Sequence, residues 1–176
     1  RRWLGEITVR HRGECGIIYC ATRRSVEAVC DLLRRTGVPA TRYHAGLDRE
    51  ERQRNQEDFL YDRSPVMVAT NAFGMGIDKS NVRYVVHYNM PRDMESYYQE
   101  AGRAGRDGER SECILLYSKG DEGTARYLIE QDRENETLDA ETLARIKERD
   151  YQRLHVMTSY CHTSGCLRSF ILRYFG

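Results

Sequence analysis

Short, nearly continuous apolar runs recur along the first two thirds of the chain. They occupy residues 16–20, 66–70, 84–88 and 112–118. Runs of this length, rich in valine, isoleucine and tyrosine, are typical of strands buried on both faces of a parallel sheet. Residues 39–47 add a short strand followed by a loop.

Helical patterns fill the intervals between these runs. Apolar side chains recur at helical spacing in residues 25–37, where Ser25 is the expected N-cap and Gly37 the C-terminal stop. Residues 48–61 open with Asp-x-x-Glu, a capping-box pattern, and predict a polar helix. Residues 94–102 predict another helix.

Alternating strands and helices predict βαβ units, and therefore an α/β fold with a parallel sheet covered by helices on both faces. In such sheets, ligands meet the loops that follow the carboxyl ends of the strands. The pattern changes after Lys119, where no strand-like run occurs and Leu154, Met157 and Cys161 keep a helical face. We therefore expect two domains, residues 1–119 and a small all-helical segment at 120–176.

Composition narrows the class of protein without naming a function. The chain has 176 residues, 40% hydrophobic and 31% charged, with a net charge of +1, so a nucleic-acid-binding surface would have to be local. It has no signal-peptide pattern and no apolar run near the roughly 20 residues of a membrane span. These features favour the cytoplasm of a bacterium or the nucleus of a eukaryote. A start at Arg1 and an end at Gly176 indicate a piece of a longer protein.

The six cysteines are expected to be reduced thiols. Cys15, Cys20, Cys30 and Cys113 lie in or beside predicted buried elements, where cysteine acts as a small hydrophobe. Near the end, Cys161 and Cys166 are separated by four residues that include His162. Zinc needs four ligands in a tetrahedron, so this pair alone does not make a site.

The loop at residues 70–81, TNAFGMGIDKSN, is long for a connection between a strand and the next element. Gly74 and Gly76 would let the backbone approach a ligand closely, and Thr70 and Asn71 could donate hydrogen bonds to phosphates. A flexible surface loop with two turn glycines explains the same residues equally well.

The segment QEAGRAGRDGE, residues 99–109, is harder to explain as an ordinary helix end. Gln99, Arg103 and Arg106 are spaced by four and three, and would share one face if the helix continued. A guanidinium group binds two phosphate oxygens at once and keeps its charge. This pattern favours phosphate or nucleotide binding over a structural turn.

Together these motifs resemble the second RecA-like lobe of RecQ-family DNA helicases. The segments that carry the resemblance are GIIYCATR, YHAGL, VMVATNAFGMGIDKSNVRYVVHYNMP and SYYQEAGRAGRDG, in the family's order. CLRSFILRYFG resembles the start of the zinc-binding subdomain of that family. The resemblance covers nearly all of the chain from Gly16 onward. The matching segments do not include the first lobe of that family, with its phosphate-binding lysine and DEAH-type acid, or the later zinc cysteines.

The resemblance implies an ATP-dependent 3′-to-5′ DNA helicase whose ATP and Mg²⁺ are shared with the first lobe of the same protein. Arg106 would be the arginine finger, with Arg103 as its catalytic companion. Asp78 would lie near the ribose. The implied ATP-binding residues are Gly76, Asp78, Gln99, Arg103 and Arg106.

The resemblance also implies partners and a second cofactor. Thr22, Arg23, Thr70 and Asn71 would hold the backbone of single-stranded DNA, and duplex DNA would be the substrate to be opened. The role of His44, in YHAGL, stays open between ligand contact and structural hydrogen bonding. Cys166, not Cys161, would bind Zn²⁺ in a longer protein that supplies three further cysteines.

Two other readings of the residues remain. The chain could be a nucleic-acid-binding module without turnover, or an α/β domain whose arginines clamp a small phosphorylated metabolite. On the helicase reading, the isolated chain is expected to be inactive because it lacks a P-loop.

Overall fold

The computed structural model describes residues 2–74, 77–131 and 139–176. The chain forms two compact units. The first consists of Arg1–Asn89 and Tyr98–Leu116, and the second of Met90–Tyr97 and Tyr117–Gly176. No helix in the described ranges is both long enough and apolar enough to cross a membrane.

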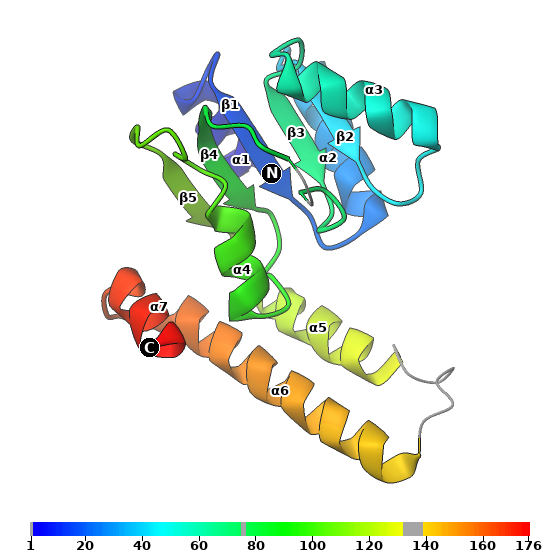
Figure 1. Cartoon of the computed structure of the whole chain (residues 1–176), viewed down its shortest axis with the longest axis vertical. Coiled ribbons are helices and arrows are strands. Elements are labelled where there is room, and N and C mark those ends of the chain that lie inside the picture. The colour runs from blue at the N-terminus through cyan, green and yellow to red at the C-terminus, as the bar shows by residue number, and fades with distance from the viewer. Residues whose placement is uncertain (1, 75–76, 132–138) are drawn as a thin grey trace. The chain divides into compact units, whose positions relative to one another are not determined.

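The first unit is built on a parallel sheet of five strands in the order β2-β3-β1-β4-β5 (Figure 1). The strands are β1 (Cys15–Tyr19), β2 (Ala40–Tyr43), β3 (Val66–Ala69), β4 (Val82–His87) and β5 (Glu112–Leu115). Each apolar run in the sequence supplies one of them, so the predicted α/β fold is confirmed. β1 lies at the centre, paired with β3 on one side and β4 on the other.

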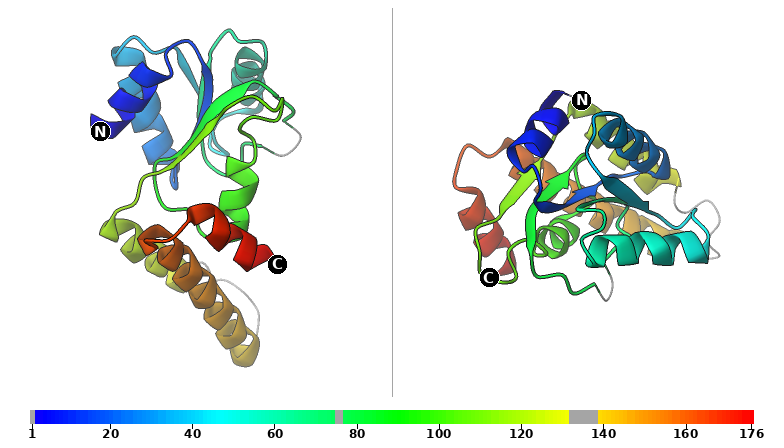
Figure 2. Two further views of the ribbon diagram at one scale, coloured as in Figure 1. Left: turned by 90° about the vertical axis from the view of Figure 1, so that its left-hand side faces the viewer. Right: turned by 90° about the horizontal axis from the view of Figure 1, so that it is seen from above.

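Helices cover both faces of this sheet, as the end-on view in Figure 2 shows. The helices of the first unit are α1 (Arg2–Arg10), α2 (Arg23–Arg35) and α3 (Arg49–Leu60), while α4 (Met94–Ala101) is divided between the two units after Tyr97. The sequence analysis did not predict α1, whose Leu4 and Ile7 are buried in the core. The expected N-cap of α2 was also wrong, because Thr22 caps that helix and Ser25 lies in its first turn.

Alternating side chains of β1 divide the core between the two faces. Ile18, together with Cys20 directly after the strand, joins the cluster that contains the apolar residues of α1 and α2. Ile17 and Tyr19 join the cluster that contains Phe59 of α3. A fully buried aliphatic side chain stabilises a fold by about 1.5–3 kcal/mol, so this central strand fixes the sheet and the loops that leave it.

The second unit contains α5 (Lys119–Gln131), α6 (Ala140–His162) and α7 (Leu167–Phe175). Leu154 and Met157 of α6 are buried, as expected, but Tyr160 takes the buried position expected for Cys161. The Tyr160 hydroxyl donates a hydrogen bond to the Tyr97 hydroxyl at 3.2 Å, and its ring packs edge-on against Phe170.

Candidate functional site

The loop that follows β3 is anchored by buried side chains and keeps polar residues accessible to solvent. Phe73 and Ile77 are buried in the core, and the Phe73 amide donates to the Thr70 carbonyl at 3.0 Å. Thr70 is half-buried and Asn71 is exposed, so both remain accessible. Gly76 lies outside the described residues. The loop therefore presents polar groups at the carboxyl edge of the sheet, where ligands of parallel sheets bind.

Arg103 lies directly over Gly74 in this loop. A Cβ at Gly74 would come within 2.2 Å of Arg103 Nη2, and the backbone there has φ +137°. Only glycine therefore fits beneath the guanidinium. The Nε atom of Arg103 is buried and has no hydrogen-bond partner within the described ranges. An unpaired buried donor is costly, so this guanidinium is held at a position where one of its donors lacks an acceptor among the described residues.

Arg106 reaches the other end of the same loop through long contacts. Its Nη1 lies 3.4 Å from the Ile77 carbonyl oxygen and 3.7 Å from Asp78 Oδ1. The Asp78 side chain is 93% exposed, so solvent screens this pair. Because its contacts are weak, the Arg106 guanidinium can turn toward a stronger anion at little cost.

The two arginines do not continue the helix, contrary to the geometry considered from the sequence. α4 ends at Ala101, and residues 102–107 form turns, so exposed Gln99 lies on the helix and the arginines lie beyond it. The turn is fastened to β4: the Gly105 amide donates to the Val82 carbonyl at 2.9 Å. Arg103 and Arg106 thus meet on one loop through a turn, not through a shared helical face.

An ion pair that the sequence analysis missed also holds this turn. Arg83 of β4 donates to Asp107, and this hydrogen bond lowers the pKa of the Asp107 carboxyl. Asp107 also accepts from the Glu109 amide at 3.1 Å. The aspartate beside Arg106 is therefore engaged with the scaffold and leaves the neighbouring guanidinium available.

Lys79, the last charged residue of the glycine loop, points away from the candidate site. It is buried, and its Nζ donates to Asp62 Oδ1 at 2.8 Å and to the Leu60 carbonyl at 3.2 Å. Hydrogen bonds from Cys15 and Lys79 lower the pKa of Asp62. Lys79 therefore joins the loop to the end of α3, and its ammonium group is engaged in these bonds and does not face a ligand site.

The loop after β1 brings a second set of sequence-predicted residues to the same edge. Thr22 Oγ1 accepts from the Ser25 amide at 3.1 Å and thereby caps α2. Arg23 is exposed in the first turn of that helix. The Ala21 amide donates to Asn89 Oδ1, which follows β4. Amides and a cation at a helix N-terminus favour an anion.

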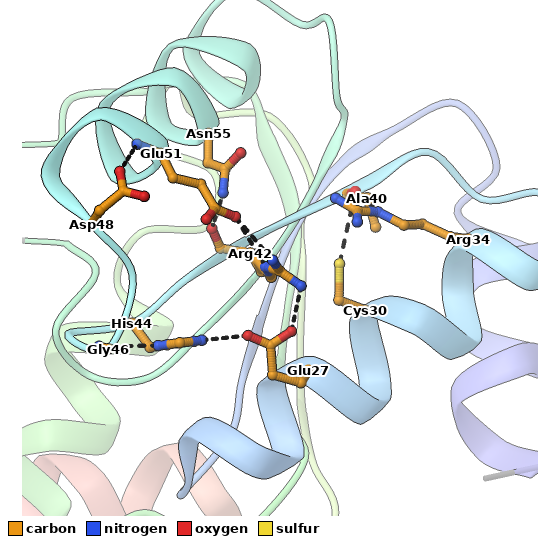
Figure 3. A network of polar contacts seen from close by, with 10 residues as sticks. All are labelled: Glu27, Cys30, Arg34, Ala40, Arg42, His44, Gly46, Asp48, Glu51 and Asn55. Carbon is orange, nitrogen blue, oxygen red and sulfur yellow. Dashed lines mark hydrogen bonds and ion pairs between the residues drawn. The ribbon is translucent and has the colours of Figure 1, made fainter.

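His44 has a structural environment that the sequence left undecided (Figure 3). Its side chain is 6% exposed. Nδ1 accepts from the Gly46 amide at 3.1 Å, and an amide can only donate, so the proton lies on Nε2 and is donated to Glu27 at 2.7 Å. Both ring nitrogens are used within the fold.

Glu27 links His44 to a wider network, here called the polar cluster and made up of Glu27, Arg42, His44 and Glu51. Arg42 donates to Glu27 through Nη1 and to Glu51 through Nη2 at 3.0 Å. Sequence reasoning missed the acids and Arg42. Arg42 and His44 are two residues apart at the end of β2, a spacing that places side chains on one face of an extended chain, but nothing in the sequence indicated the two acids.

The two C-terminal thiols differ in their chemistry. Cys166 caps α7 at an exposed position, where hydrogen bonds from Ser169 lower the pKa of its thiol. Burial and the nearby acids of α5 raise the pKa of Cys161 to about 11. The described ranges contain no group of three side chains that could together hold a metal ion.

Two family models match this chain, one after the other along the sequence. Residues 1–108 match the family model of the helicase conserved C-terminal domain, and residues 119–176 match that of the RecQ zinc-binding region. The chain is 50% identical to the ATP-dependent DNA helicase RecQ of Bacillus subtilis over 99% of this chain and 28% of that protein. It is 45% identical to the ATP-dependent DNA helicase hus2/rqh1 of Schizosaccharomyces pombe over 94% of this chain and 12% of that protein. The chain thus spans less than a third of these curated relatives.

Solved structures with the same fold include the C-terminal domain of the DEAD-box protein Dbp5. The TM-score is 0.60 at 26% identity, over 84% of this chain and 89% of that domain. Dbp5 from S. cerevisiae bound to RNA and ADP BeF3 gives a TM-score of 0.61 at 24% identity, over 86% of this chain and 41% of that one. At 24% identity, the likeness to the RNA-bound protein shows the fold alone.

Proposed function

Because this chain belongs to the family of helicase conserved C-terminal domains, we propose that it is the second RecA-like lobe of an ATP-dependent 3′-to-5′ DNA helicase of RecQ type. Residues 1–119 would form that lobe, and residues 120–176 the beginning of a zinc-binding subdomain. The first lobe of the same protein would complete the ATP site. The observation that carries the proposal is that Arg103 and Arg106, in the turn after α4, both contact the loop after β3.

The two arginines suit different tasks at a triphosphate. Arg103 is held in place over Gly74 and has an unpaired Nε, so it is suited to a fixed phosphate contact. Arg106 has only long contacts and is 39% exposed, so it can swing onto charge that develops during phosphoryl transfer. Asp78 would then release Arg106 and accept from the ribose, with Gly76 and Gln99 completing the nucleotide contacts. Mg²⁺ held by the first lobe would neutralise phosphate charge.

The loops after β1 and β3 would bind the backbone of single-stranded DNA. Thr22, Arg23, Thr70 and Asn71 offer hydroxyl, guanidinium and amide groups at one edge of the sheet. Phosphate contacts of this kind ignore base sequence and weaken as salt rises. Closing of the two lobes on ATP and opening after hydrolysis would alternate this grip and move the strand.

Arg106→Ala in the full-length protein tests the assignment. We expect ATP turnover to fall by roughly 10³ or more, the usual size of an arginine-finger effect, with DNA binding largely intact. Arg103→Ala should also be severe. Arg110→Ala is the matched control. Arg110 is an exposed arginine four residues away, and the variant that lacks it should turn over ATP normally. Normal turnover by Arg106→Ala would contradict the proposal.

A further inference from the structure

The polar cluster joins three elements next to the predicted DNA-binding edge. Glu27 comes from α2, Arg42 from β2 and Glu51 from α3, while His44 begins the loop after β2. β2 is one of the two edge strands of the sheet, so side chains at its end can contact helices that lie on either face. The Asn55 side chain also donates to the Arg42 carbonyl at 2.8 Å. The cluster is therefore braced from more than one side.

Within the cluster, His44 determines where the following loop lies. Its Nδ1 holds the Gly46 amide, and its Nε2–H holds Glu27. The ring is buried, with both nitrogens occupied, and cannot contact a ligand without breaking one of these bonds. Its effect on binding must therefore pass through the residues it fixes.

The loop held by His44 packs against Arg23. A Cβ added at Gly46 would lie 3.1 Å from Arg23 Cδ and 3.3 Å from Arg23 Nη1, so the arginine side chain rests on this glycine. Arg23 and Glu27 are four residues apart on α2 and share one helical face. The acid that anchors His44 is thus also the acid best placed to capture Arg23.

We infer that His44 is a positioning residue for single-strand binding: it occupies Glu27 and holds Gly46, and thereby keeps the Arg23 guanidinium directed toward phosphate. Without His44, Glu27 loses a partner and can draw Arg23 into an ion pair along α2, while the loop that supports Arg23 is released. This inference rests on the proposed function, because it takes Arg23 to be a DNA contact.

The test is a double-mutant cycle on the full-length protein, with binding of single-stranded DNA measured across a salt series. Arg23→Ala should weaken binding roughly tenfold and lower the slope of log affinity against log salt by about 0.7, the value for one phosphate of a single strand. His44→Ala should reproduce both changes. The double variant should bind no more weakly than Arg23→Ala alone.

Two conservative variants separate the contacts of the ring. The amide oxygen of His44→Asn can replace Nδ1 as acceptor for Gly46, whereas His44→Gln can keep a donor for Glu27. Since the inference requires both bonds, each variant should lower the salt slope. His11→Ala is the matched control. His11 also bonds two acids, Glu14 at 2.7 Å and Glu112 at 2.8 Å, but it precedes β1 and so lies at the amino ends of the strands, away from the predicted DNA contacts. Its salt slope should be unchanged.

The outcomes distinguish the inference from its premise. Independent, additive losses from Arg23→Ala and His44→Ala would overturn the inference while leaving the DNA contact of Arg23 intact. An unchanged salt slope in folded His44 variants would do the same. An unaffected Arg23→Ala would remove the DNA contact from the proposed function, and the inference with it. Thermal melting of each variant shows whether a loss reflects misfolding.

Discussion

Cys161 and Cys166 illustrate how neighbouring residues of one type acquire different chemistry. Metal ions bind the thiolate form of cysteine, so a lowered pKa favours ligation and a raised pKa opposes it. Hydrogen bonds from Ser169 lower the pKa of Cys166, whereas burial raises that of Cys161 to about 11. We therefore expect the exposed thiol at the start of α7 to be the better zinc ligand.

We therefore predict that the full-length protein loses its zinc in Cys166→Ser and keeps it in Cys161→Ser. One cysteine supplies one of the four ligands that zinc requires, so the 176-residue chain alone should bind no stoichiometric zinc. Metal analysis of the purified variants measures this directly. Zinc lost on changing Cys161 alone would reverse the assignment.

At the scale of elements, one buried lysine ties together parts of the chain that are distant in sequence. Lys79 belongs to the glycine loop, and its partner Asp62 follows α3 and also accepts from Cys15 of β1 at 2.8 Å. The lysine is buried while the Asp62 side chain is 56% exposed, so water weakens the pair without replacing it. The loop that carries Asp78 depends on this anchor.

Acid should loosen that anchor. The folded-state pKa of Asp62 is lowered, so its contribution to stability is present above the unfolded-state value near 4 and is lost as the pH falls through the folded-state value. At neutral pH, Asp62→Asn should lower the free energy of unfolding by about 1–3 kcal/mol, the range for a buried donor, here Lys79, that loses its hydrogen-bond partner.

Urea unfolding at pH 7 and in acid measures this change, and the variant should lose less stability than the parent below pH 4. Asp58→Asn is the matched control, because Asp58 pairs with Arg63 at 2.7 Å where both side chains are exposed. That control should stay within about 0.5 kcal/mol of the parent. Equal losses in the two variants would show that burial of Lys79 is not the cause.

The elements themselves were largely predictable from sequence, because apolar periodicity reports which residues are buried. The N-cap at Asp48 is an example: its side chain accepts from the Glu51 amide at 2.7 Å, although the Glu51 carboxylate bonds to Arg42 and does not complete a capping box. The contact of Glu27 with His44 was not predictable, because it joins a helix to a loop 17 residues later through tertiary packing. The turn after Ala101 was missed for a related reason, since its bond from Gly105 to Val82 is long-range.

At the scale of the whole molecule, the proposed function gives the chain only one side of an ATP site. Its sequence has no Gly-Lys pair, and so no P-loop to hold the β- and γ-phosphates. We predict that the purified 176-residue chain has negligible ATPase activity with or without single-stranded DNA, whereas the full-length protein hydrolyses ATP. A phosphate-release assay measures both. DNA-stimulated turnover by the chain alone would exclude the proposal of two cooperating lobes.

The order of the strands also has a consequence for synthesis on the ribosome. β1 is made before the other strands, yet it becomes the centre of the sheet only when β3 and β4 pair with it on either side. His87 follows its partner Tyr19 by 68 residues, which at 5–20 residues per second is roughly 3–14 s of translation. Until β4 is made, this apolar strand keeps at least one unpaired edge. Sheets assembled from such distant pairings fold slowly, so we expect the nascent chain to bind chaperones that recognise extended apolar segments.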